Sequence, residues 1–192
     1  MCVKGERMKE IKDGYLRVTE CLSKYNDFSK IDPLILHNAC ERGTKVHNYC
    51  FLYAKQEYFP EPDDNNIAGF VESFAQFFDE MVEDVIELEK RYYDKDFKIT
   101  GAIDAVVRLR GSDVPVIIDY KTPVAESKTW KMQLSAYKWL YDNDLNTKEK
   151  SKRRIALMLK KDGSFPKIIE YTSPQDWELY KAALSLHRYF YG

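Results

Sequence analysis

Apolar residues recur at three- and four-residue steps in four stretches of the chain, the spacing that brings side chains onto one face of a helix. This pattern predicts helices over about 33–57, 67–84 and 127–143, and a last helix that carries Trp177 to Tyr191. Asp32-Pro33 supplies an N-cap followed by proline at the first helical position, and Ser173-Pro174 marks the start of the last helix.

The period changes after the second helix. Residues 85–93, 98–110 and 114–121 are rich in β-branched and aromatic side chains, which predicts a three-stranded antiparallel meander. Two further strands are expected at 154–160 and 167–172, around Asp162-Gly163. We therefore expect an α/β fold, a mixed central sheet with an antiparallel meander flanked by helices. One domain would span 1–192, with a helical part over about 1–84 and the sheet and its helices over about 85–192.

The second and third strands of the meander carry two aspartates. If Gly111-Ser112 forms the centre of the turn, Asp104 faces Asp119 across the ladder, and Lys121 projects to the same face. Two facing carboxylates repel each other, so structure alone gives no reason to keep them there. A divalent cation does, because oxygen ligands from adjacent strands converge on a hard metal ion.

Composition narrows the class of protein. The chain has 192 residues, of which 44% are hydrophobic, and its formal net charge is −1, so it lacks the global basic field of sequence-blind nucleic-acid coating proteins. Seven basic residues within 148–161 are a local candidate for phosphate contact, although a solvated surface is the simpler interpretation. No run approaches the roughly 18 uninterrupted apolar residues of a membrane span, and the charged first residues do not resemble a secretory signal. A cytoplasmic protein with no membrane partner is expected.

Cysteine spacing argues against a disulfide framework or a cysteine-ligated metal. The four cysteines are Cys2, Cys21, Cys40 and Cys50, and none forms a CxxC pair. In a reducing compartment such residues are small buried hydrophobes more often than ligands.

Four motifs occur in a recognisable order. They are Gly43-Thr44-x-x-His47, Gly101-x-x-Asp104, Ile118-Asp119-Tyr120-Lys121-Thr122 and Gln133-x-x-x-Tyr137. Together they resemble the PD-(D/E)XK nuclease superfamily, specifically its RecB-like exonuclease branch. The segment with Val18-Thr19 before an expected loop is also similar to small phage and prophage members of that branch.

The resemblance implies a role for each motif residue. Asp104, Asp119, the carbonyl of Tyr120 and His47 would ligate the metal, and Lys121 would orient or help deprotonate the attacking water. Gln133 and Tyr137 share a helix face and would contact a phosphate or position Lys121. The family also places a glutamate on the preceding strand, where Glu87 and Glu89 both fit and Glu89 is preferred. Ordinary packing stays open for Tyr137, and a core histidine is the usual alternative for His47.

The function implied is a Mg²⁺- or Mn²⁺-dependent deoxyribonuclease, favoured as an exonuclease, that hydrolyses DNA ends in phage-type recombination, repair or DNA processing. A homo-oligomer or a recombination or replication partner stays open. The alternatives are a non-catalytic nucleic-acid-binding module on the same fold and an RNA-processing nuclease. Iron-sulfur members of the branch carry three cysteines near the C-terminus, whereas every cysteine here precedes residue 51, so no iron-sulfur cluster is expected.

Overall fold

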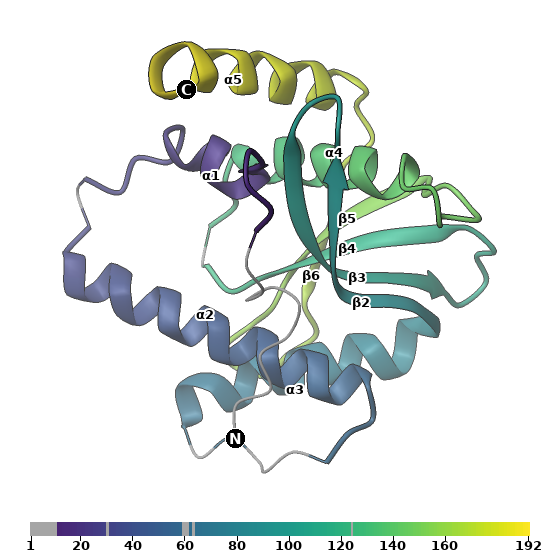
Figure 1. Cartoon of the computed structure of the whole chain (residues 1–192). Helices are drawn as coiled ribbons and strands as arrows, with labels where there is room; N and C mark the ends of the chain where they lie inside the picture. The colour runs from purple at the N-terminus through teal and green to yellow at the C-terminus, as the bar shows by residue number, and fades with distance from the viewer. Residues whose placement is uncertain (1–10, 30, 59–61, 63, 124) are drawn as a thin grey trace.

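A six-stranded mixed sheet lies between two layers of helices (Figure 1). The computed structural model describes residues 11–29, 31–58, 62, 64–123 and 125–192. Helices α2 (Pro33–Ala54) and α3 (Asn65–Met81) cover one face of the sheet, and α1 (Val18–Ser23), α4 (Thr129–Asp142) and α5 (Gln175–Tyr191) cover the other. The expected mixed α/β architecture, a central sheet flanked by helices, is confirmed.

The strands run in the order β1-β3-β4-β5-β6, and β2 pairs with β3 as well. Their bounds are β1 (Leu16–Arg17), β2 (Val82–Asp94), β3 (Ile99–Leu109), β4 (Pro115–Lys121), β5 (Arg153–Met158) and β6 (Lys167–Glu170). Strands β2, β3 and β4 form the predicted antiparallel meander. Strand β5 then lies parallel to β4, with α4 as the crossover, and β6 returns antiparallel to β5.

The predicted β3–β4 register is confirmed from Ala105, which pairs with Ile118, to Arg108, which pairs with Pro115. The turn itself differs from the expectation. The Ser112 amide donates to the Leu109 carbonyl at 2.9 Å, so Arg110 and Gly111 are its central residues. Gly111 has a φ of 73°, a left-handed conformation that glycine adopts without steric cost.

The β3–β4 ladder ends before the two aspartates, so the expected cross-strand pair of Asp104 with Asp119 does not form. Strand β4 stays paired with β5 as far as Lys121. Because β2 occupies the opposite edge of β3 throughout, β1 and β4 lie on the same edge, and β1 pairs with residues 99–100. Residues 101–104 of β3 therefore lie in a gap between β4 and β1.

Short elements and boundaries account for the other differences. Val18 and Thr19 begin helix α1 rather than preceding a loop, and β1 was not expected because two residues carry no periodicity. Helix α3 ends at Met81, and Val82 already pairs with Leu109 in the sheet. Among the cysteines, Cys21 and Cys50 are buried free thiols, Cys40 is exposed, and Cys2 lies outside the described residues.

Two adjacent arginines of β5 have different surroundings. Arg154 and Asp176 form a buried ion pair at 2.7 Å, in which the side chains are 6% and 5% exposed, and Arg154 also donates to the carbonyls of Lys131, Tyr171 and Ser173. Arg153 forms a half-exposed pair with Glu170 at 2.8 Å. The buried pair fixes the start of α5 against the sheet.

Replacing Arg154 with methionine should destabilise the protein by about 3–5 kcal/mol, because Asp176 would remain buried without its counter-charge. The matched change Arg153→Met should cost about 1 kcal/mol or less, since its partner stays solvated. Urea denaturation of both variants measures the difference. Equal losses of stability would contradict the structural role of Arg154.

Candidate active site

Three potential metal ligands converge where β3 and β4 separate. One donor atom from each of His47, Glu89 and Asp104 lies within 4.8 Å of the other two. His47 Nδ1 is 3.2 Å from Asp104 Oδ2, and Asp104 and Glu89 are only 1% and 5% exposed. An imidazole nitrogen with two carboxylate oxygens is a donor set that suits a divalent ion such as Mn²⁺ and also admits Mg²⁺. The chemistry of the residues therefore fits a divalent cation.

Each ligand comes from a different element of the fold. His47 projects from α2, next to Val46, which is buried in the core beneath that helix. Asp104 is anchored by the amide of Tyr120, which donates to its Oδ2 at 2.7 Å. Glu89 lies across the β2–β3 ladder from Asp104 and has a φ of 48°. A left-handed glutamate costs about 1–3 kcal/mol, a strain that is typical of functional sites.

Asp119 belongs to a second group of polar residues beside the first. It forms an ion pair with Lys121, and its Oδ1 accepts a hydrogen bond from Gln133 Nε2 at 2.9 Å. Lys121 Nζ also donates to Gln133 Oε1 at 2.9 Å. Gln133 thus holds both the carboxylate and the ammonium. The repulsion expected between Asp104 and Asp119 is offset, because each carboxylate accepts its own hydrogen bond and Asp119 has a cation at its side.

Tyr137 extends this network to the surface of β3. Its hydroxyl lies 3.0 Å from Gln133 Nε2, and the side chain is buried. Gly101 makes this position possible, because a Cβ at residue 101 would lie 2.6 Å from Tyr137 Cε1. The glycine of the Gly101-x-x-Asp104 motif therefore has a packing reason.

Burial and the nearby carboxylates together set the electrostatics around the ligands. The pKa of the Cys50 thiol and the pKa of the Tyr120 hydroxyl are both raised well above their usual values. Burial is the largest cause in each case, and the carboxylates of Asp104 and Glu89 add to it. Such a concentration of negative charge favours a bound cation.

The structure brings the proposed site residues into one region but in two groups. His47, Glu89 and Asp104 form the ligand cluster, whereas Asp119, Lys121, Gln133 and Tyr137 form the hydrogen-bonded group. Tyr120 links the two groups. Its backbone amide donates to Asp104, and its side-chain ring lies 5.5 Å from the His47 ring, measured between ring centroids. Glu87 lies apart, paired with Lys90 near the surface. The sequence motifs did not single out Arg91, which lies near this site because it follows Glu89 by two residues on β2.

Comparison with known proteins identifies the family of this chain. Residues 34–187 match the family model of the PD-(D/E)XK nuclease superfamily. The chain belongs to that superfamily. Its sheet and helices form the restriction-endonuclease-like PD-(D/E)XK fold, and nucleases of this superfamily use divalent metals and act on nucleic acids.

Two other comparisons add little about activity. A solved structure described as "Crystal structure of SSO0001" is similar to this chain with 15% sequence identity and a TM-score of 0.46, over 95% of this chain and 78% of that one. No curated protein matches the sequence. Among the residues that the structure describes, no helix combines the length and the apolar character needed to cross a membrane.

The metal cluster can be tested with two neighbouring glutamates. Mn²⁺ at about 100 times its dissociation constant should stabilise the wild type by roughly 2.7 kcal/mol, or about 5–10 °C in melting temperature for a chain of this size. Glu89→Gln should lose most of that shift relative to EDTA, because an amide oxygen is a poorer ligand. The matched variant Glu87→Gln should keep it. Equal shifts in both variants would place the metal elsewhere.

Proposed function

We propose that this chain is a Mg²⁺- or Mn²⁺-dependent deoxyribonuclease that acts as an exonuclease in DNA recombination, repair or processing. The observation that carries the proposal is the convergence of His47, Glu89 and Asp104 beside the Lys121–Asp119–Gln133 group. A metal site without a positively charged side chain nearby would fit simple metal storage or a structural ion. The partly buried Lys121 beside this site supports hydrolysis of a phosphodiester instead.

In this proposal the cation is held by His47, Glu89 and Asp104, with Asp119 and the carbonyl of Tyr120 as the further ligands that the family motif implies. When bound, a divalent cation supplies Lewis-acid activation of the phosphate and of the attacking water. The other catalytic and positioning roles belong to side chains of the protein.

Lys121 is the residue that we propose acts on the reacting atoms. Its ammonium carries three N–H donors, and the contacts with Asp119 and Gln133 use two of them. The third donates to the attacking water or to a non-bridging phosphate oxygen, where positive charge stabilises the charge that develops in the transition state. Gln133 positions Lys121 and Asp119, and Tyr137 positions Gln133 through its hydroxyl.

The exonuclease assignment and the RecB-like, phage-type branch rest on the order of the four motifs, Gly43 to His47, Gly101 to Asp104, Ile118 to Thr122 and Gln133 to Tyr137. The preference for DNA rests on the same resemblance.

Purified protein should degrade DNA when Mg²⁺ or Mn²⁺ is present and stop when EDTA is added. Single-stranded DNA, duplex DNA, closed circular DNA and RNA incubated side by side separate the possible activities, since an exonuclease spares the closed circle. Preferential loss of RNA would replace the proposal with an RNA-processing nuclease. Folded protein that binds nucleic acid but cleaves none would indicate a non-catalytic binding module.

Lys121→Met should reduce cleavage by about 100-fold or more, as expected for loss of a transition-state charge contact. The variant should still bind Mn²⁺, because Lys121 is not a ligand, and calorimetry measures this directly. Lys138→Met on the surface of α4 serves as the lysine control and should cleave like the wild type. Loss of Mn²⁺ binding together with cleavage would contradict the role assigned to Lys121.

A further inference from the structure

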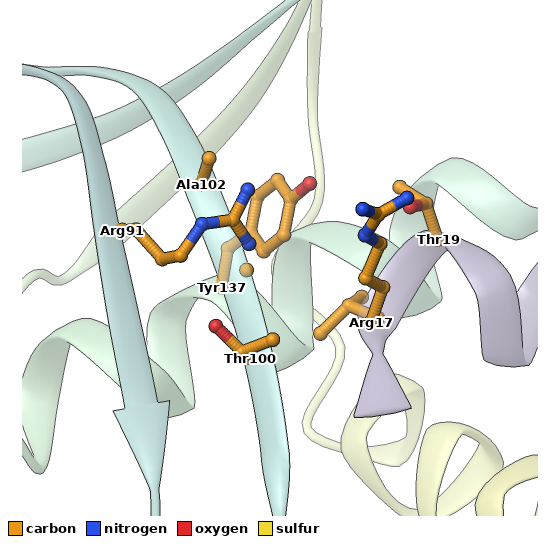
Figure 2. Close-up of a pocket in the computed structure, with 8 residues that line it drawn as sticks. Arg17, Thr19, Arg91, Thr100, Ala102 and Tyr137 are labelled. Carbon is orange, nitrogen blue, oxygen red and sulfur yellow. The ribbon is translucent and has the colours of Figure 1, made fainter. Parts of the chain in front are cut away.

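A separate pocket opens in the gap between β4 and β1, beside residues 101–104 of β3. It has a volume of about 370 Å³, and residues 100–102 of β3 form its floor together with the Tyr137 ring (Figure 2). Its walls come from β1, α1 and β2, so the short N-terminal elements close it. None of the three metal-ligand candidates lines this pocket.

Among the described residues that line the pocket, the two charged side chains are both arginines. Arg17 and Arg91 extend into it from different strands, on either side of the Tyr137 ring in Figure 2, and Thr19 adds a hydroxyl at its rim. None of the described residues that line it is acidic. Guanidinium groups donate planar pairs of N–H bonds that match phosphate oxygens, and two of them match the double negative charge of a terminal phosphate.

The pocket is linked to the candidate active site by a continuous chain of contacts. Tyr137 lines the pocket and its hydroxyl is 3.0 Å from Gln133 Nε2, which in turn donates to Asp119 at 2.9 Å. Arg91 follows Glu89 by two residues on β2, so the pocket and the ligand cluster are built on the same strand.

We propose that Arg17 and Arg91 bind a phosphate group of the substrate strand other than the phosphate that is hydrolysed. The proposal rests on the nuclease function proposed above and adds how the strand is placed in the site. A terminal phosphate and an internal phosphate share this chemistry. They differ in charge and in dependence on a free end, and the experiment separates them on that basis.

The test is a binding measurement in EDTA, where cleavage does not occur. Three labelled oligonucleotides of one sequence carry a 5′-phosphate, a 3′-phosphate or hydroxyls at both ends, and fluorescence anisotropy gives the affinity of each. Arg17→Gln and Arg91→Gln should weaken binding by about 10- to 100-fold, the size expected for losing hydrogen bonds to a charged group. Arg110→Gln, at the exposed tip of the β3–β4 turn, is the matched control and should bind like the wild type.

The pattern of losses identifies the phosphate. A loss confined to one phosphorylated oligonucleotide assigns the pocket to that terminal phosphate, and an equal loss for all three assigns it to an internal phosphate. Arg17 is exposed, so its variant should fold, and thermal melting checks both variants. Affinities like that of Arg110→Gln in both variants, or no binding of any oligonucleotide by the wild type, would overturn the proposal. Wild type that binds through these arginines but cleaves nothing with Mn²⁺ would reject the nuclease function alone.

Discussion

The hydrogen bond from the Tyr120 amide to the Asp104 carboxylate is the interaction on which the rest of the site depends. In a regular antiparallel pair this amide would donate to a backbone carbonyl of β3. Here a side chain accepts the bond instead, so the two strands separate without leaving the amide unsatisfied. The separation places Asp104 and Asp119 in different surroundings and leaves a gap between β4 and β1 beside residues 101–104 of β3. One side-chain acceptor in place of a backbone carbonyl thus leads to both the ligand cluster and the adjoining pocket.

Two of the buried carboxylates are compensated locally. Asp119 has the ammonium of Lys121, and Asp104 has the Tyr120 amide and the ring of His47. The left-handed backbone of Glu89 indicates that the fold accepts strain to keep a third carboxylate there. Isolated carboxylates at such depth would be protonated or excluded, so a bound cation is the physical counterpart of this arrangement.

The sequence predicted those features that depend on local pattern. The helices, the meander and the β3–β4 register followed from periodicity, because a one-residue slip would turn Asp119 toward the apolar face. The sequence did not predict where that ladder ends. The hydrogen bond between the Tyr120 amide and the Asp104 carboxylate depends on tertiary structure and leaves no periodic signal in the sequence. Glu89 lies in the ligand cluster and Glu87 pairs with Lys90, a difference that the spacing of the two glutamates did not decide. The sequence did not pair Arg17 with Arg91, because they lie 74 positions apart in a chain rich in basic residues.

The segment that matches the family model and the folding unit have different boundaries in this chain. The superfamily match begins at residue 34, yet Val18, Cys21 and Leu22 belong to the same core cluster as the buried residues of α4 and α5. Asn26 also accepts hydrogen bonds from Ser127 and Thr129 at the start of α4. Residues upstream of the shared segment therefore complete the hydrophobic interior that supports the helix carrying Gln133. Substitutions in this upstream part would therefore act on the candidate site through the packing of α4 rather than through its polar groups.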